Sequence, residues 1–94
     1  MNYLFPEDIN KHGSAGFIGT KYFGARGRQM NEALKKAGLL SGDCHSGYVI
    51  TSEGEEYSAG RDEWYFTIVN VLCERDPSLR RVYNYRRTGI WDFE

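Results

Sequence analysis

The chain has 94 residues, a formal net charge of −1 and 15% aromatic residues. Its length suits one domain over residues 1–94, since a chain of this size buries roughly 60–65% of its unfolded surface. It contains no apolar run near the ~20 residues of a membrane span and no basic segment followed by an apolar one at its start. We therefore expect a cytoplasmic protein without membrane association, and the small net charge argues against a generic nucleic-acid binder.

Two short helices are predicted near the N-terminus. Residues 5–10 begin the first, because Pro6 suits an initial helical turn and acidic residues follow it. Residues 17–23 predict the second, which Gly24 ends, although their aromatic content leaves a strand as the alternative. Its expected inward side chains are Phe17, Ile18 and Tyr22, with Phe23 left open.

The clearest helical pattern covers residues 25–37. Met30, Ala33, Leu34 and Ala37 form one apolar stripe, and Gly38 follows where a glycine commonly ends a helix. The opposite face carries Arg28, Glu32 and Lys35, flanked by Gln29, Asn31 and Lys36.

A small β-hairpin is predicted next. Leu39 and Leu40 can pair with residues 48–50, so residues 41–47 would form its tip. Thr51 or Ser52 then caps another short helix, because the Ser52 to Glu55 spacing is that of a capping box. We expect Met30, Leu34, Leu39, Ile50 and Tyr57 to share one core with Ile18 and Tyr22.

The last third of the chain is harder to predict. Residues 63–73 form an apolar run that fits a buried helix or a central strand; with Asp62 as a cap, we favour the helix. Residues 76–78 open a further helix, which Gly89 stops, and residues 90–93 form an aromatic tail that we expect to be partly covered.

Residues 17–57 contain a pattern with functional meaning. Counted from Gly16, the residues Thr20, Gly24 and Met30 hold the small, glycine and apolar positions of a helix-turn-helix. The wider pattern consists of Phe23-Gly24, Arg28, Met30-Asn31, Leu34 and Gly38-Leu39, followed by Tyr48, Ile50-Thr51, Gly54 and Tyr57. It resembles the small winged-helix-like domains of phage and prophage proteins, including the C-terminal part of some phage antirepressors.

The resemblance implies an α+β fold in which a helix-turn-helix and a short hairpin occupy residues 17–57. Residues 60–94 would form a helical or mixed C-terminal extension. In that family the helix over residues 25–37 would be the recognition helix, and the protein would be a DNA-binding regulator in a bacterium or phage-infected cell. The expected DNA contacts are Lys21, Arg26, Arg28, Gln29 and Lys35.

Charge supports two readings of the partner. Residues 11–38 carry six cations against Glu32, whereas residues 39–66 carry six carboxylates against Arg61, which is an asymmetry typical of a face for an anionic partner. However, Glu32 lies in the middle of the recognition face and would repel phosphate. The alternative function is a phage-encoded inhibitor that binds a host protein, for example of a defence system, without DNA.

A protein partner would use a different surface. Tyr, Trp and Arg dominate interface energies, and the C-terminal segment concentrates them. The candidate interaction residues are Arg80, Tyr83, Arg87 and Trp91. A second copy of the chain is also a candidate partner, and the interleaved aromatic and arginine residues leave a second nucleic-acid surface as an alternative.

Catalysis and metal binding are not expected. The chain has no phosphate loop and no nucleophile motif, so we predict that it is not an enzyme and needs no cofactor. Cys44, His45, His12 and Cys73 lack the paired spacing of zinc ligands. We expect an accessible Cys44, a buried Cys73, and neither a disulfide nor a metal.

Overall fold

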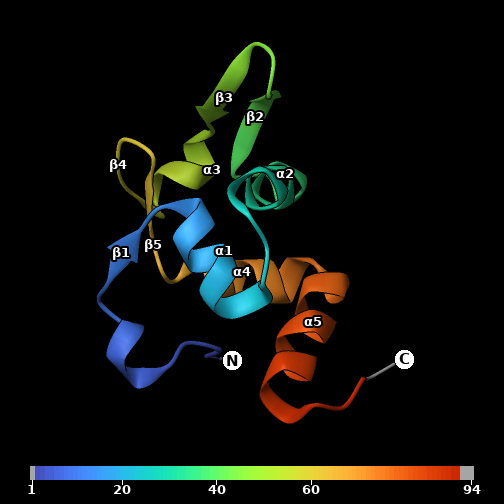
Figure 1. Cartoon of the computed structure of the whole chain (residues 1–94). Coiled ribbons are helices and arrows are strands. Elements are labelled where there is room, and N and C mark those ends of the chain that lie inside the picture. The colour runs from blue at the N-terminus through green and yellow to red at the C-terminus, as the bar shows by residue number, and fades with distance from the viewer. Residues whose placement is uncertain (1, 92–94) are drawn as a thin grey trace.

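The computed structural model describes residues 2–91, and these form an α+β fold of short helices and two antiparallel sheets (Figure 1). A 3-10 turn, η1 (Pro6–Asp8), and a two-residue strand, β1 (His12–Gly13), precede helix α1 (Ala15–Phe23). The Ser14 hydroxyl starts α1 by accepting the Phe17 N–H, and Gly24 ends it at a φ of 66°, as the sequence predicts.

Helix α2 (Gly27–Lys36) lies within the predicted residues 25–37. Its apolar stripe is inward, since Met30 and Leu34 are fully buried. The close approach of α1 depends on Gly19, where an added Cβ would collide with the Met30 side chain and lie 2.8 Å from the Ala25 carbonyl oxygen. The small residue at this junction is therefore Gly19, whereas Thr20 is exposed and its hydroxyl donates to Ala25.

The predicted hairpin is confirmed as strands β2 (Leu40–Asp43) and β3 (Gly47–Ile50), with Leu40 opposite Ile50. The Asp43 carboxylate fixes the tip by accepting the backbone N–H groups of His45 and Ser46. Helix α3 (Ser52–Glu55) follows, capped by the Thr51 hydroxyl, which accepts the Gly54 N–H.

The prediction of one helix over residues 63–73 is wrong for residues 63–67, which precede helix α4 (Ile68–Arg75). Strand β5 (Glu63–Tyr65) pairs with β1 on one side and with β4 (Ser58–Gly60) on the other, in a sheet of order β1-β5-β4. Helix α4 begins only after β5. Asp62 does not cap a helix, because it occupies the left-handed region at a φ of 59° in the turn between the two strands. Tyr65 and Phe66 are instead tied by backbone hydrogen bonds to Tyr57 and Lys11.

Helix α5 (Pro77–Thr88) is the predicted C-terminal helix. The Asp76 carboxylate caps it by accepting the N–H groups of Ser78 and Leu79, and Gly89 ends it at a φ of 74°. Of the aromatic tail, Ile90 and Trp91 are exposed, and Trp91 stacks on Tyr85; the remainder lies outside the described residues. No helix among residues 2–91 has the length and apolar character needed to cross a bilayer.

One core joins all of these elements. Ile18, Tyr22, Met30, Leu34 and Leu39 are buried in it, and Ile50 and Tyr57 pack against it half-buried, so the predicted core is confirmed. The aromatic and aliphatic side chains of β5 and α4 complete it, namely Trp64, Phe66, Ile68, Val69 and Leu72. The inward prediction for Phe17 is wrong, since Phe17 is 59% exposed and only the edge of its ring contacts Phe66; Phe23 is buried.

Candidate nucleic-acid interface and neighbouring groove

The exposed side of α2 carries the residues predicted to contact DNA. Arg28, Glu32 and Lys35 point away from the core, with Arg26 and Gln29 beside them at the start of the helix. No described residue forms an ion pair with Arg26, Arg28, Lys35 or Lys36. The side chain of Gln29 already makes one hydrogen bond within the protein, because its carbonyl oxygen accepts the Arg26 N–H at 2.9 Å.

The β2–β3 hairpin is held against this side of α2. The Tyr48 hydroxyl donates to the Glu32 carboxylate, which raises the pKa of Tyr48 to about 12. Near the tip, an Arg28 guanidinium nitrogen lies 3.9 Å from the Cys44 sulfur. The exposed side of α2 (Arg26, Arg28, Gln29, Glu32 and Lys35) and the hairpin tip (residues 43–48) thus form one continuous surface, here called the α2–hairpin surface.

Lys21 is not part of the α2–hairpin surface. It is half-buried on α1, where its ammonium nitrogen lies 2.7 Å from a carboxylate oxygen of the fully buried Asp8. Tyr22 donates to the same Asp8 oxygen at 2.6 Å. Burial would raise the pKa of Asp8, but the hydrogen bonds from Lys21 and Tyr22 and the charges of Lys21 and Lys11 outweigh it and lower that pKa.

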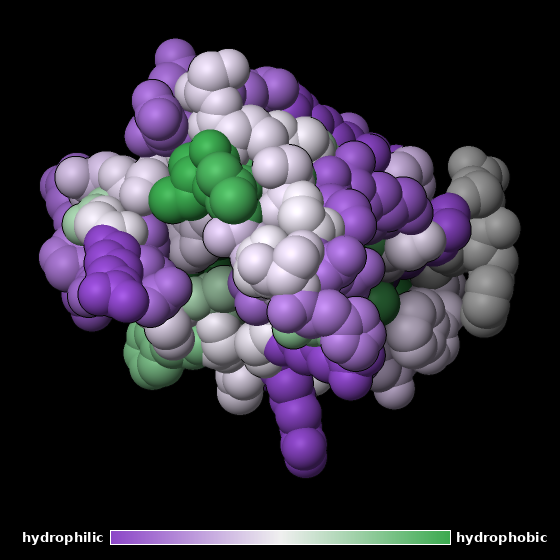
Figure 2. Space-filling view, turned by 90° about the horizontal axis from the view of Figure 1, so that it is seen from above, coloured by the Kyte–Doolittle hydropathy of each residue, from purple (hydrophilic) through white to green (hydrophobic). Residues whose placement is uncertain are grey.

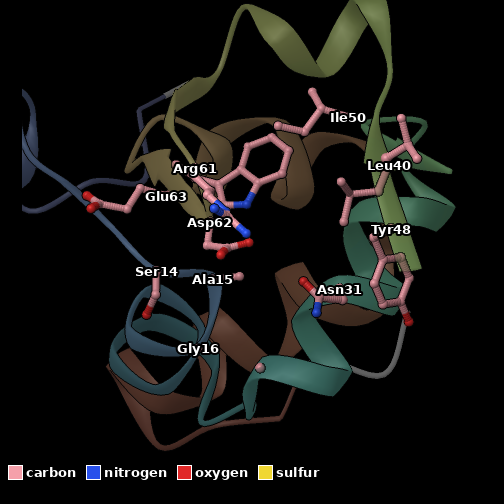
Figure 3. A pocket seen from close by; sticks show the side chains of 13 residues that line it. Ser14, Ala15, Gly16, Asn31, Leu40, Tyr48, Ile50, Arg61, Asp62 and Glu63 are labelled. Atoms are coloured by element: carbon pink, nitrogen blue, oxygen red, sulfur yellow. The ribbon is translucent and has the colours of Figure 1, made fainter. Parts of the chain in front are cut away.

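A groove of about 840 Å³ opens behind the hairpin, between the first turn of α1, α2 and the β4–β5 turn (Figure 3). One part of its wall is apolar, formed by Ala15, Leu40, Ile50 and Trp64. Asn31 from α2 and Asp62 from the β4–β5 turn extend into it from opposite sides (Figure 3). An apolar wall with a few polar groups is the usual composition of a binding cleft.

Two features mark the groove. Trp64 lines it and is only 4% exposed, so most of the indole ring is covered by the wall. The starts of α1 and α2 meet at its edge, where a Cβ on Gly16 would lie 3.4 Å from the Gly27 Cα. Sequence reasoning missed this groove because five separate stretches of the chain line it, and only the folded structure brings them together.

Seen from the hairpin end, the molecular surface is largely hydrophilic and carries an isolated apolar patch (Figure 2). Among the residues of the hairpin, Val49 on β3 is the large aliphatic residue with the greatest exposure, at 63%, and it lines the groove.

The four residues predicted for protein interaction differ in exposure. The prediction for Tyr83 requires correction, because Tyr83 is buried and its hydroxyl donates to the Tyr3 carbonyl at 2.6 Å. Arg87 is exposed, but it donates to the Tyr83 hydroxyl and lies over the Phe5 ring. Arg80 is half-buried, and Trp91 is exposed against Tyr85.

Both cysteines are free thiols, with Cys44 exposed and Cys73 buried, as predicted. Burial raises the pKa of Cys73 to about 12. Within residues 2–91, no three His, Cys, Asp or Glu side chains lie close enough together to hold a metal ion.

Comparison of the chain with models of known protein families, with curated proteins and with solved structures gave no match.

Proposed function

We propose that the chain binds DNA through the α2–hairpin surface, in the manner of a small winged-helix protein of phage type. The main support is that contacts from Tyr48 to Glu32 and from Arg28 to Cys44 hold the hairpin beside the exposed side of α2. Helix and hairpin therefore present one surface to a partner. The order of helix, glycine turn, helix and hairpin supports the same reading.

The charges of this surface fit a polyanion. Arg26, Arg28, Lys35 and Lys36 have no ion-pair partner among the described residues, so their charges are available to phosphates. The one carboxylate on the exposed side of α2, Glu32, accepts a hydrogen bond from Tyr48. An α-helix is about 10–12 Å across with its side chains, which fits a major groove about 12 Å wide, and the ten residues of α2 make it about 15 Å long.

The proposal is tested by measuring the affinity for a fluorescent DNA duplex across a salt series. Arg28→Gln and Lys35→Gln should each weaken binding at every sequence and lower the salt slope by about one unit. Arg61→Gln is the matched control, because it removes an exposed cation from the β4–β5 turn on the other side of the groove. Equal salt slopes for all three variants and the unmodified chain would contradict the assignment.

A second candidate is a host-protein inhibitor that uses the groove. It is favoured by the apolar wall, the nearly buried Trp64 that is part of it, and the exposed Val49 at the rim. Val49→Asp should then abolish binding to the protein partner without unfolding the chain, since Val49 is largely exposed. The candidate is rejected if Arg28→Gln, and not Val49→Asp, removes every interaction that the protein makes.

A further inference from the structure

A small pocket is lined by residues of the N-terminal segment, α1 and α5. The N-terminal segment and α5 lie at the end of the molecule away from the hairpin (Figure 1). The pocket has a volume of about 100 Å³ and is lined by Phe5, Lys21, Tyr22, Tyr83, Arg86 and Arg87. Three of these six side chains are cations, the other three are aromatic, and none is a carboxylate. Like charges that line one cavity repel each other unless an anion joins them.

Internal contacts hold the cations of this cationic pocket in place. Asp8, which does not line it, holds Lys21 through one ammonium nitrogen contact of 2.7 Å. Arg87 donates to the Tyr83 hydroxyl at 2.7 Å, and its guanidinium carbon lies 5.0 Å from the centre of the Phe5 ring. Arg86 reaches the Thr20 carbonyl at 3.4 Å. Each of these contacts uses only part of the donor set, because an ammonium has three N–H groups and a guanidinium has five.

The local charge is positive even after Asp8 is counted. Lys21, Arg86 and Arg87 stand against one carboxylate, and the pKa of that carboxyl is lowered by its lysine neighbours, so it is ionised at neutral pH. Arg86 and Arg87 are exposed, which leaves the pocket open to solvent on one side. Positively charged donors around a cavity with aromatic walls are suited to an oxyanion.

We propose that the cationic pocket binds a single phosphate group. Its volume of about 100 Å³ is roughly an eighth of that of the groove behind the hairpin, which matches it to a small anion such as one phosphate group. Any remainder of the ligand stays outside, next to the exposed arginines. This site is separate from the α2–hairpin surface, so it does not depend on the proposed DNA binding.

The first test is thermal unfolding in sodium phosphate and in sodium chloride at equal ionic strength. Phosphate should raise the melting temperature saturably beyond the effect of chloride, because a ligand of the folded state stabilises it. Arg86→Gln should weaken phosphate binding at least tenfold relative to its own baseline in chloride. Arg80→Gln, on the same helix but outside the pocket, should bind phosphate as the unmodified chain does. Equal melting curves in the two salts, or full phosphate binding by Arg86→Gln, would overturn the proposal.

Arg86→Gln is preferred because Arg86 is exposed and makes only a long hydrogen bond, so the variant should fold. Calorimetric titration then identifies the source of the phosphate group. A small phosphate monoester is identified if adenosine 5′-monophosphate binds with the same dependence on Arg86 and adenosine does not bind. A nucleic-acid backbone is identified if an oligothymidylate without a terminal phosphate shows that dependence instead. Arg80→Gln, which lies outside the pocket, should leave the adenosine 5′-monophosphate titration unchanged. Duplex binding by the α2–hairpin surface is measured separately with Arg28→Gln and Lys35→Gln, so failure of this proposal is distinct from failure of DNA binding.

Discussion

Asp8 shows how one buried carboxylate organises its surroundings. Its side chain is fully buried, and it accepts from Tyr22 while its charge is balanced by Lys21. Its second oxygen has no hydrogen-bond partner among the described residues, although Lys11 lies 3.8 Å away. A buried charge is tolerated only when it is paired in this way. Asp8 therefore fixes Lys21 at the edge of the cationic pocket.

Asp8→Asn should destabilise the fold at pH 7. Breaking a buried pair costs roughly 3–5 kcal/mol, and the partial exposure of Lys21 reduces this to about 2–3 kcal/mol. The pKa of Asp8 is lowered from its ordinary value of 3.8, so its stabilising effect is present above that pH and is lost as the pH falls through the folded-state pKa. Urea unfolding should therefore show a stability gap between the two proteins that narrows below about pH 4. Glu56→Gln, an exposed control, should show no gap, and a gap for Asp8→Asn that is constant down to pH 2 would disprove this account.

The close packing of helix α1 on helix α2 depends on Gly19. Gly19→Ala should destabilise the protein by about 1–3 kcal/mol through overpacking, although alanine is the better helix former by roughly 1 kcal/mol. The reason is that the added methyl group meets Met30 and the Ala25 carbonyl. Gly27→Ala is the matched control, since its methyl group would lie 3.8 Å from Gly16. Thermal melting should show a loss for the first variant only; equal melting temperatures would contradict the close packing.

Glu32 determines how strongly the α2–hairpin surface attracts DNA. Glu32→Gln removes the carboxylate from the exposed side of α2 and keeps an acceptor for the Tyr48 hydroxyl, so the hairpin should stay in place. Non-specific DNA binding at low salt should become several-fold tighter, because less negative charge opposes the phosphates. Tyr48→Phe is the comparison, since it loses the hydrogen bond and keeps the charge. Weaker binding by Glu32→Gln would mean that Glu32 reads a base and does not merely repel the backbone.

Local signals in the sequence were enough to predict α1, α2, the hairpin and α5. Gly24 ends α1 and Gly89 ends α5, both in the left-handed conformation. Thr51 caps the start of α3 and Asp76 caps the start of α5, so each signal lies next to the helix end that it defines. Residues 58–67 could not be predicted in this way, because β5 is fixed by pairing with distant β1 as well as with β4. The same limit applies to the candidate sites. Tyr83 is predicted to be an interaction residue because Tyr and Arg are typical of interfaces, but it is buried and contacts Tyr3, 80 residues away.

At the scale of the whole molecule, the N-terminal segment closes the core by packing on α4 and α5. The Tyr3 N–H donates to the Asn70 side chain at 2.6 Å, and the Tyr3 carbonyl accepts from the buried Tyr83 hydroxyl at the same distance. Both bonds join positions more than 60 residues apart, so they form only when the whole chain is folded. Cys73, fully buried on α4, reports on that closure, because its thiol can react only after the core opens.

Tyr83→Phe in a Cys44→Ser background should accelerate thiol labelling of Cys73. The variant keeps the ring but leaves the Tyr3 carbonyl without its donor, which costs about 1–3 kcal/mol and raises the population of the open state roughly 5- to 150-fold. With a slowly reacting reagent, the core opens and closes many times before the thiol reacts, so the labelling rate follows the open population and should increase by that factor. Tyr85→Phe is the matched control on the same helix, because Tyr85 is exposed and stacks on Trp91 through its ring. If both variants label at the rate of the parent, the contact between the N-terminal segment and α5 does not limit the opening of the core, and Cys73 becomes accessible through a more local motion of α4.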